Sequence, residues 1–186
     1  TSDPRKVSIP NLDSIEKYSE FCIKDLHTYV DTEYVLVIQY DGFILNPQSW
    51  TDEFLKYDYI GAPWFIEREF WFTKFGLPRE LKGTTVVGNG GFSLRSKKFL
   101  EASAKLAERG VFEKYQPEDL VLCVFRKKEM EQEGIVFAPK EVAEKFSVEG
   151  SDQVYDSQFG FHGLQWTDIS KWITENPEWG IELENK

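Results

Sequence analysis

The sequence predicts an α/β fold in which a mixed, mostly parallel central sheet is flanked by helices. Apolar residues recur at helical spacing over residues 15–29, and the nearly continuous apolar run YVLVIQY follows at 34–40. A run of this kind is typical of a strand that is covered on both faces. A second strand-like stretch, at 84–95, leads into a helical pattern over 96–109. Helices and strands that alternate in this way are typical of α/β domains.

Capping and turn residues set the limits of these elements. Ser14 is a typical N-cap for the first helix, and Gly110 is a typical end for the helix over 96–109. Glycines divide 84–95 into two strand pieces. The other elements are expected in this order: a short strand at 7–9, a short helix at 50–56, a strand or turn at 59–64, a helix at 117–132, a strand at 135–138, a short helix or edge strand within 140–149, and a short apolar stretch at 159–163.

One long segment shows no clean period. Residues 64–83 are rich in aromatic side chains and contain Gly76 and Pro78, so we expect a long loop there. Long loops in compact domains often carry function. The alternative is that the rings of this segment simply complete the core.

The totals indicate one globular domain over residues 1–186, with a lead-in at 1–13 and an acidic C-terminal tail at 166–186. The net charge of −10 argues against a nucleic-acid partner and against an anionic membrane surface, because both attract basic proteins. No apolar run approaches the roughly 20 residues of a membrane span. The sequence leaves the oligomeric state open.

Cysteine usage favours a reducing compartment. Cys22 and Cys123 are far apart and belong to no CxxC or Cys/His cluster, so a structural zinc site is not expected. We expect two buried free thiols rather than a disulfide, and hence a cytoplasmic protein.

Two motifs follow strands. Asp41 ends the run at 34–40 and is followed by a glycine, so its carboxylate is placed to hold Mg²⁺ or Mn²⁺ through oxygen, or to make an Asx turn. The sequence VGNGGFSLR contains three glycines and Asn89, which permit positive φ and close approach of a ligand; the alternative is a plain hairpin turn or bulge. No GK[ST] follows, so a P-loop is not supported.

Two further motifs carry titratable groups. Glu118 and Asp119 begin a predicted helix, where one carboxylate is placed to act as a general base and the helix dipole favours its ionised form. Simple charge matching to the dipole is the alternative. His162 lies between apolar residues and glycines in FGFHG; it is either a Mn²⁺ ligand or a core histidine.

Together the four motifs resemble the core of GT-A glycosyltransferases, which present in order a DxD-type metal motif, a glycine-rich loop, an xED motif and a late metal-binding histidine. The stretches YDYIGAPW, VGNGGFSLRS, PED and FGFHG also resemble a widespread family of glycosyltransferase-like proteins classed as a domain of unknown function. The resemblance covers roughly residues 14–165.

The resemblance implies a role for each matching position. It implies these assignments: Asp41 and His162 as metal ligands; Gln39, Asn89, Gly90, Gly91, Arg95 and Trp64 as residues that bind the donor or the acceptor; Asp119 as the catalytic base; and Glu118 as its neighbour. Gln39 stands where the first acid of the DxD motif usually stands, so the metal has one carboxylate fewer. Fewer βα units precede residue 34 than GT-A domains carry for the nucleotide, so the domain is either minimal or part of a longer protein.

The implied activity is hexosyl or pentosyl transfer from a nucleotide-diphosphate sugar to a carbohydrate or other hydroxyl acceptor, assisted by Mn²⁺ or Mg²⁺. A single positioned base favours an inverting route. On this reading, residues 64–75 form a mobile lid over the acceptor. Two other functions stay open: a carbohydrate-binding module, favoured by the six tryptophans, and a metal-dependent phosphoesterase.

Overall fold

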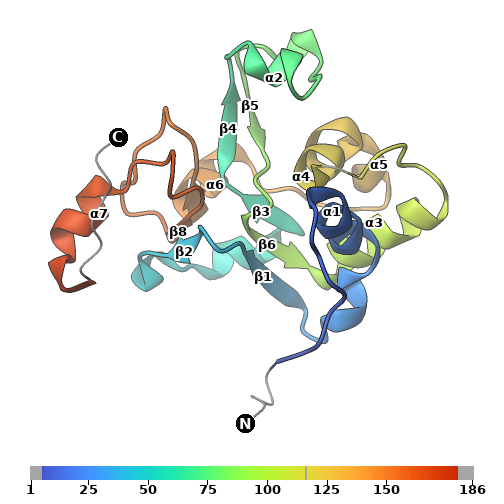
Figure 1. Ribbon diagram of the computed structural model, residues 1–186, viewed down its shortest axis with the longest axis horizontal. Coiled ribbons are helices and arrows are strands. Elements are labelled where there is room, and N and C mark those ends of the chain that lie inside the picture. Colours follow the sequence, from blue (N-terminus) through green and yellow to red (C-terminus); the bar gives the residue numbers. More distant parts are fainter. Residues whose placement is uncertain (1–5, 116, 180–186) are drawn as a thin grey trace.

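The computed structural model describes residues 6–115 and 117–179 and shows a mixed α/β architecture with three small open sheets. Expectations for residues 1–5 and 180–186 lie outside the described residues. In Figure 1, helices α1, α3, α4 and α5 gather on one side, while β2, β8 and α7 lie on the other. Strands β4 and β5 rise between the two groups and end in α2.

The central sheet is antiparallel rather than mostly parallel. It contains β1 (Tyr34–Ile38), β6 (Phe92–Ser96) and β3 (Tyr59–Gly61) in the order β1-β6-β3, and both pairs are antiparallel. Within the described residues β1 lies at the edge of this sheet and is only half-buried. The apolar run at 34–40 therefore forms an edge strand and is not covered on both faces. The expectation of a mostly parallel sheet rested on this run and was wrong.

Side chains of β6 alternate between two environments. Phe92 and Leu94 point into one hydrophobic cluster, while Arg95 contacts Glu118 on the opposite, helical face. This alternation follows from the two-residue period of a strand. Strand β6 thus joins the main core to the polar groups of the site.

The helical face of the sheet is covered by α1 (Ile15–Lys24) and α3 (Lys97–Glu108). Ser14 caps α1 by accepting a hydrogen bond from the Lys17 amide, as predicted, and the last part of the expected helix is a 3₁₀ turn at Leu26–Tyr29. Cys22 and Cys123 are buried free thiols, which confirms that part of the cysteine prediction.

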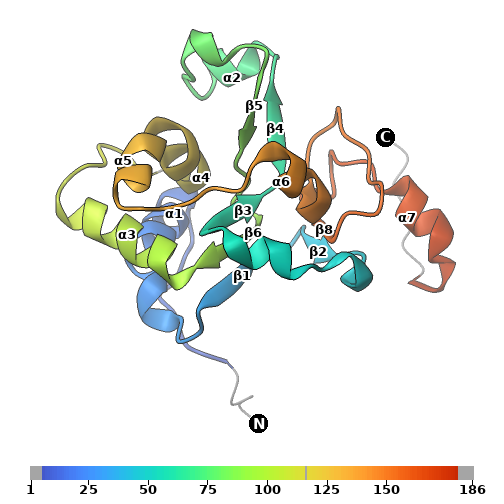
Figure 2. The same cartoon turned by 180° about the vertical axis from the view of Figure 1, so that it is seen from behind.

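Aromatic side chains fill the other face, where α6 (Lys140–Phe146) packs against the sheet. Phe146 lies 5.2 Å from Phe54, 5.4 Å from Phe92 and 5.8 Å from Phe159, measured between ring centroids. Figure 2 shows α6 lying over this face, beside β3. The cluster joins the central sheet to the segment that leads into β8.

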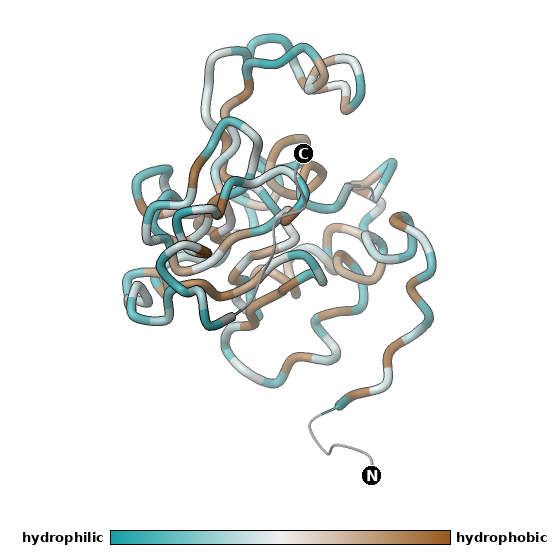
Figure 3. Tube along the Cα trace, turned by 60° about the vertical axis from the view of Figure 1, so that its left-hand side comes forward, coloured by the Kyte–Doolittle hydropathy of each residue, from teal (hydrophilic) through white to brown (hydrophobic). Residues whose placement is uncertain are grey.

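The segment expected to be a long loop forms a β-hairpin with a helical tip, which we call the arm. Strand β4 (Pro63–Ile66) pairs antiparallel with β5 (Thr84–Val87), and α2 (Phe70–Thr73) lies between them. Trp64 and Ile66 are buried while Phe65 is exposed. The alternation of buried and exposed side chains extends over only the four residues of β4, so it cannot be recognised in a sequence rich in aromatic residues. Figure 3 shows the arm standing off the body, with hydrophobic and hydrophilic residues mixed at its tip.

The helix expected over 117–132 is interrupted. It consists of α4 (Glu118–Leu120), a π-helical turn at Val121–Phe125 and α5 (Lys127–Gln132). The expected strand at 7–9 is not formed. Four further 3₁₀ turns lie at Pro47–Ser49, Asp52–Lys56, Arg79–Leu81 and Pro177–Trp179 within the described ranges.

A second small sheet holds the C-terminal part of the chain. Strand β8 (Gly160–Phe161) pairs antiparallel with β2 (Phe43–Ile44) and parallel with β7 (Ser147–Val148). Helix α7 (Ser170–Glu175) packs on it through Trp172, whose Nε1 donates to the Leu45 carbonyl. The described part of the acidic tail is therefore folded onto the domain. None of the described helices is long and apolar enough to cross a membrane.

Removing the fully buried Phe54 should destabilise the fold strongly. Phe54→Ala should cost about 3–5 kcal/mol, because it leaves a cavity among the rings around α6. The neighbouring Leu55 is 37% exposed, so Leu55→Ala should change the free energy of unfolding by no more than about 0.5 kcal/mol. Urea unfolding measures both. Equal effects of the two substitutions would contradict this assignment of the core.

Candidate active site

A cavity of about 600 Å³ opens between the arm, the start of α4 and residues 149–153. Among the residues that the sequence predicts for the site, Trp64, Asp119 and His162 line it. Gln39, Asp41, Asn89, Gly90, Gly91, Arg95 and Glu118 are not among its lining residues. The predicted residues therefore divide into a group at the cavity wall and a group behind it.

His162 and Asp41 come together as predicted. The His162 Nε2 atom lies 3.1 Å from Asp41 Oδ1 and 3.1 Å from Gln39 Oε1. The pairing of β2 with β8 causes this, because it places the chain just before Phe43 beside the chain just after Phe161. The Gly163 amide also donates to the Asp41 carbonyl, at 3.1 Å.

Glu149 is a residue of this site that the sequence analysis missed. Its Oε1 lies 2.7 Å from His162 Nδ1, and its Oε2 accepts a hydrogen bond from Trp64 Nε1. Burial raises the pKa of Glu149, but hydrogen bonds from His162, Trp64 and Asn89 outweigh it and lower the pKa. A single glutamate between a strand and a glycine carries no pattern that sequence reasoning could use. The contact fixes the ring orientation of His162.

The same contact influences the charge of the histidine. Burial lowers the pKa of His162, but the hydrogen bond and charge of Glu149, with a further contribution from Asp41, raise it overall. Nδ1 of the ring faces Glu149, and Nε2 faces Asp41 and Gln39. A neutral ring with its proton on Nδ1, directed at Glu149, would present the Nε2 lone pair to a cation.

The glycines of the turn at 88–91 make room for protein side chains rather than for a ligand. A Cβ atom at Gly91 would lie 2.1 Å from His162 Nε2, and one at Gly90 would lie 2.2 Å from Glu118 Oε1. The positive φ belongs to Asn89 (φ 59°), whose Oδ1 accepts the Phe92 amide proton at 2.9 Å. Asn89 is buried, so in this structure it orders the turn instead of facing the cavity.

A buried ion pair supports the turn from below. Arg95 Nη2 lies 2.9 Å from Glu118 Oε1 and 3.2 Å from the Gly90 carbonyl oxygen. Tyr59 Oη donates toward the carbonyl oxygens of Gly88 and Asn89. Glu118 is 4% exposed, and its ion pair directs it at Arg95. Glu118 therefore positions the turn.

Asp119 presents its carboxyl group to the cavity. Its Oδ2 accepts the Gly90 amide proton at 2.9 Å, and its Oδ1 accepts that of Leu120 at 2.8 Å. Burial, reinforced by the charge of Glu118, raises the pKa of Asp119 to about 7. The helix start was expected to favour the ionised form; burial acts in the opposite direction and raises the pKa of this group.

The donor set could hold a divalent cation weakly. Within the described residues no group of three or more His, Cys, Asp or Glu side chains is arranged for a metal. Asp41 Oδ1 is buried and has no hydrogen-bond partner among those residues; it lies 3.1 Å from His162 Nε2, which also lies 3.1 Å from Gln39 Oε1. Neighbouring ligands of one ion at about 2.1 Å lie roughly 3 Å apart. The separations of His162 Nε2 from Asp41 Oδ1 and from Gln39 Oε1 fit a cation that takes its remaining ligands from a bound substrate.

Comparison with known proteins identifies a family. A family model described as "Protein of unknown function (DUF5672)" matches residues 3–162, so the chain belongs to that family. No curated protein and no solved structure matches the chain significantly. The matched region reaches His162 and contains the residues of the site described above.

The raised pKa of Asp119 should make stability depend on pH. Between about pH 4 and pH 7 the folded state keeps this proton while the unfolded state loses it, so stability should fall as pH rises through that range. Asp119→Asn should remove this contribution and gain stability relative to the native protein at pH 8, but not at pH 4. Urea unfolding across this range tests it, with Asp52→Asn as the exposed control. Parallel curves for the native and Asp119→Asn proteins would contradict the pKa.

Proposed function

We propose that this chain is the catalytic domain of a GT-A-type glycosyltransferase that uses a nucleotide-diphosphate sugar to glycosylate a hydroxyl acceptor. The observation that carries the proposal is Asp119. Its carboxyl lines the cavity, two backbone amides fix its direction, and its pKa is about 7. A general base works best when its pKa lies near the operating pH.

The proposed step is a single displacement. Asp119 accepts the proton of the acceptor hydroxyl as the hydroxyl oxygen bonds to the anomeric carbon. The bond from that carbon to the diphosphate oxygen breaks, and the diphosphate leaves with the electron pair. Glu149 is held by His162 and Trp64, and Glu118 by Arg95, so neither is free to act as a covalent nucleophile. Asp152 also lines the cavity, so the proposal of inversion rests on Asp119 as the one carboxyl group in the described lining of the cavity that backbone amides fix in place.

A Mn²⁺ or Mg²⁺ ion bound by Asp41, His162 and Gln39 would stabilise the negative charge of the leaving diphosphate. Since Gln39 is neutral, the protein supplies one carboxylate at this place. Substrate oxygens then have a large share in holding the ion, as is usual for Mg²⁺. We therefore expect metal and nucleoside diphosphate to bind cooperatively.

A carbohydrate-binding module without catalysis is the second candidate. The aromatic side chains of the arm that line the cavity favour it, because flat rings suit the faces of sugars. It differs from the first candidate in requiring no base: sugar binding would persist with no transfer under any combination of donor and metal.

Asp119→Asn should lower turnover by about 10²–10⁴-fold, because it removes the base while keeping the size of the side chain. Donor affinity should change little. The donor is first chosen by a thermal-shift screen of nucleotide sugars with Mn²⁺, and transfer is then measured for native, Asp119→Asn and the exposed control Asp52→Asn. Turnover of the native protein should also rise as pH passes about 7, because ionised Asp119 is the active form. A folded Asp119→Asn protein with native turnover removes Asp119 from the mechanism.

Glu149→Gln should weaken Mn²⁺ binding by about 10–100-fold, because it replaces the carboxylate that orients His162. The amide still offers an oxygen to Trp64, so the fold should survive. Mn²⁺ binding in the presence of UDP or GDP can be followed by electron paramagnetic resonance. The exposed Glu144→Gln is the matched control. Equal Mn²⁺ affinity for native, Glu149→Gln and Glu144→Gln would show that His162 does not bind the ion.

A further inference from the structure

The arm carries more aromatic surface than its own core requires. Phe72 and Leu77 are buried, and together with Trp64 and Ile66 they form the core of the arm. Phe70 and Trp71 come from the same short helix but line the cavity, and Phe70 is 39% exposed. Trp71 packs against this core and also lines the cavity, whereas the exposure of Phe70 is not explained by packing within the arm.

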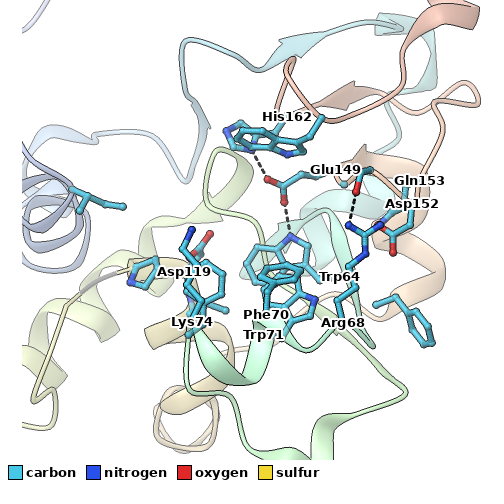
Figure 4. A pocket seen from close by; sticks show the side chains of 18 residues that line it. Trp64, Arg68, Phe70, Trp71, Lys74, Asp119, Glu149, Asp152, Gln153 and His162 are labelled. Carbon is cyan, nitrogen blue, oxygen red and sulfur yellow. Dashed lines mark hydrogen bonds and ion pairs between the residues drawn. The ribbon is translucent and has the colours of Figure 1, made fainter. Parts of the chain in front are cut away.

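These rings form a continuous wall, which we define as Trp64, Phe70, Trp71 and Phe75. The ring centroid of Trp71 lies 5.4 Å from that of Trp64, 4.7 Å from that of Phe70 and 5.7 Å from that of Phe75. Figure 4 shows Phe70 and Trp71 beside Trp64, whose indole nitrogen points to Glu149. The wall thus begins at the catalytic groups and extends over more than one ring.

Polar side chains from another segment share the cavity with this wall. Ser151, Asp152 and Gln153 line it, and Arg68 Nη1 donates to Ser151 Oγ at 2.7 Å. Gln153 Nε2 donates to the Pro63 carbonyl at 2.7 Å, which ties this segment to the arm. A ligand with a flat apolar face and a polar rim fits this combination, and a pyranose ring has that form.

The charged groups of the cavity do not select an anionic occupant of the wall. Three carboxyl groups line it, from Asp119, Glu149 and Asp152, together with three basic side chains, Arg68, Lys74 and His162. Arg68 is bonded to Ser151, and the Lys74 ammonium lies 5.3 Å from the Phe75 ring centroid. A phosphate group placed here would meet carboxyl groups as well as cations, with no excess of positive charge to hold it. A neutral ligand needs no such excess.

We infer that the aromatic wall is a binding site for a neutral oligosaccharide of at least two rings. One ring lies beside Asp119 and Trp64, and the next lies on Trp71, Phe70 and Phe75. Calling this oligosaccharide the acceptor rests on the proposed function, whereas binding to the wall does not.

The test measures binding without donor or metal. The full chain is titrated with maltose, cellobiose, lactose and N,N′-diacetylchitobiose, and with the matching monosaccharides, by tryptophan fluorescence and calorimetry. At least one disaccharide should bind, and more tightly than its monosaccharide. Phe70→Ala and Phe75→Ala should each weaken it about 3- to 10-fold, the range for losing one aromatic contact. Phe70→Tyr should restore binding, and Phe125→Ala, at a phenylalanine 37% exposed outside the cavity lining, should leave it unchanged.

Three results would overturn the inference. In the first, none of the disaccharides binds at millimolar concentration. In the second, Phe125→Ala weakens disaccharide binding as much as Phe70→Ala does. In the third, Phe70→Ala abolishes UDP or GDP binding and leaves sugar binding intact. The last result would assign the wall to a nucleobase. If the native protein binds a disaccharide through the wall but transfers no sugar, the proposed function fails while the binding site stands.

Discussion

The buried ion pair between Arg95 and Glu118 is the contact on which the geometry of the site depends. Both side chains lie beneath the glycine turn, and the guanidinium also reaches the Gly90 carbonyl. This glycine turn directs the Gly90 amide at Asp119, and it leaves space for His162 beside Gly91. Removing one partner would leave an uncompensated buried charge, which costs about 3–5 kcal/mol. The strain would fall on the groups that face the cavity.

A second chain of contacts connects the arm to the interior. Trp64 on β4 donates to Glu149, Glu149 holds His162, and His162 lies against Asp41. These four residues come from four separate places in the sequence. The position of the arm and the orientation of His162 therefore depend on the same chain of contacts.

The sequence predicted the parts of the fold that have long or capped patterns. The first helix with its Ser14 cap, the two strand pieces on either side of the glycines and the helix expected over 96–109, found at Lys97–Glu108, are present. The arm was missed because a four-residue strand shows too little alternation among aromatic neighbours. The π-helical turn was missed because its residues read as an ordinary continuation of a helix. Strand β1 was expected to be covered on both faces because its sequence is an apolar run, but it lies at the edge of the sheet.

The candidate site, like the fold, was predicted only in part. The meeting of Asp41 and His162 was expected from the resemblance to GT-A domains; their spacing in the sequence does not predict it. The roles of the glycines were harder to foresee, because only the folded structure shows that side chains fill the space beside them. Because a side chain at position 91 would occupy the space of His162, the residues at positions 91 and 162 should vary together among members of the family. Any family member with a larger residue at 91 would need a smaller side chain at 162, so substitutions at these two positions should appear together or not at all.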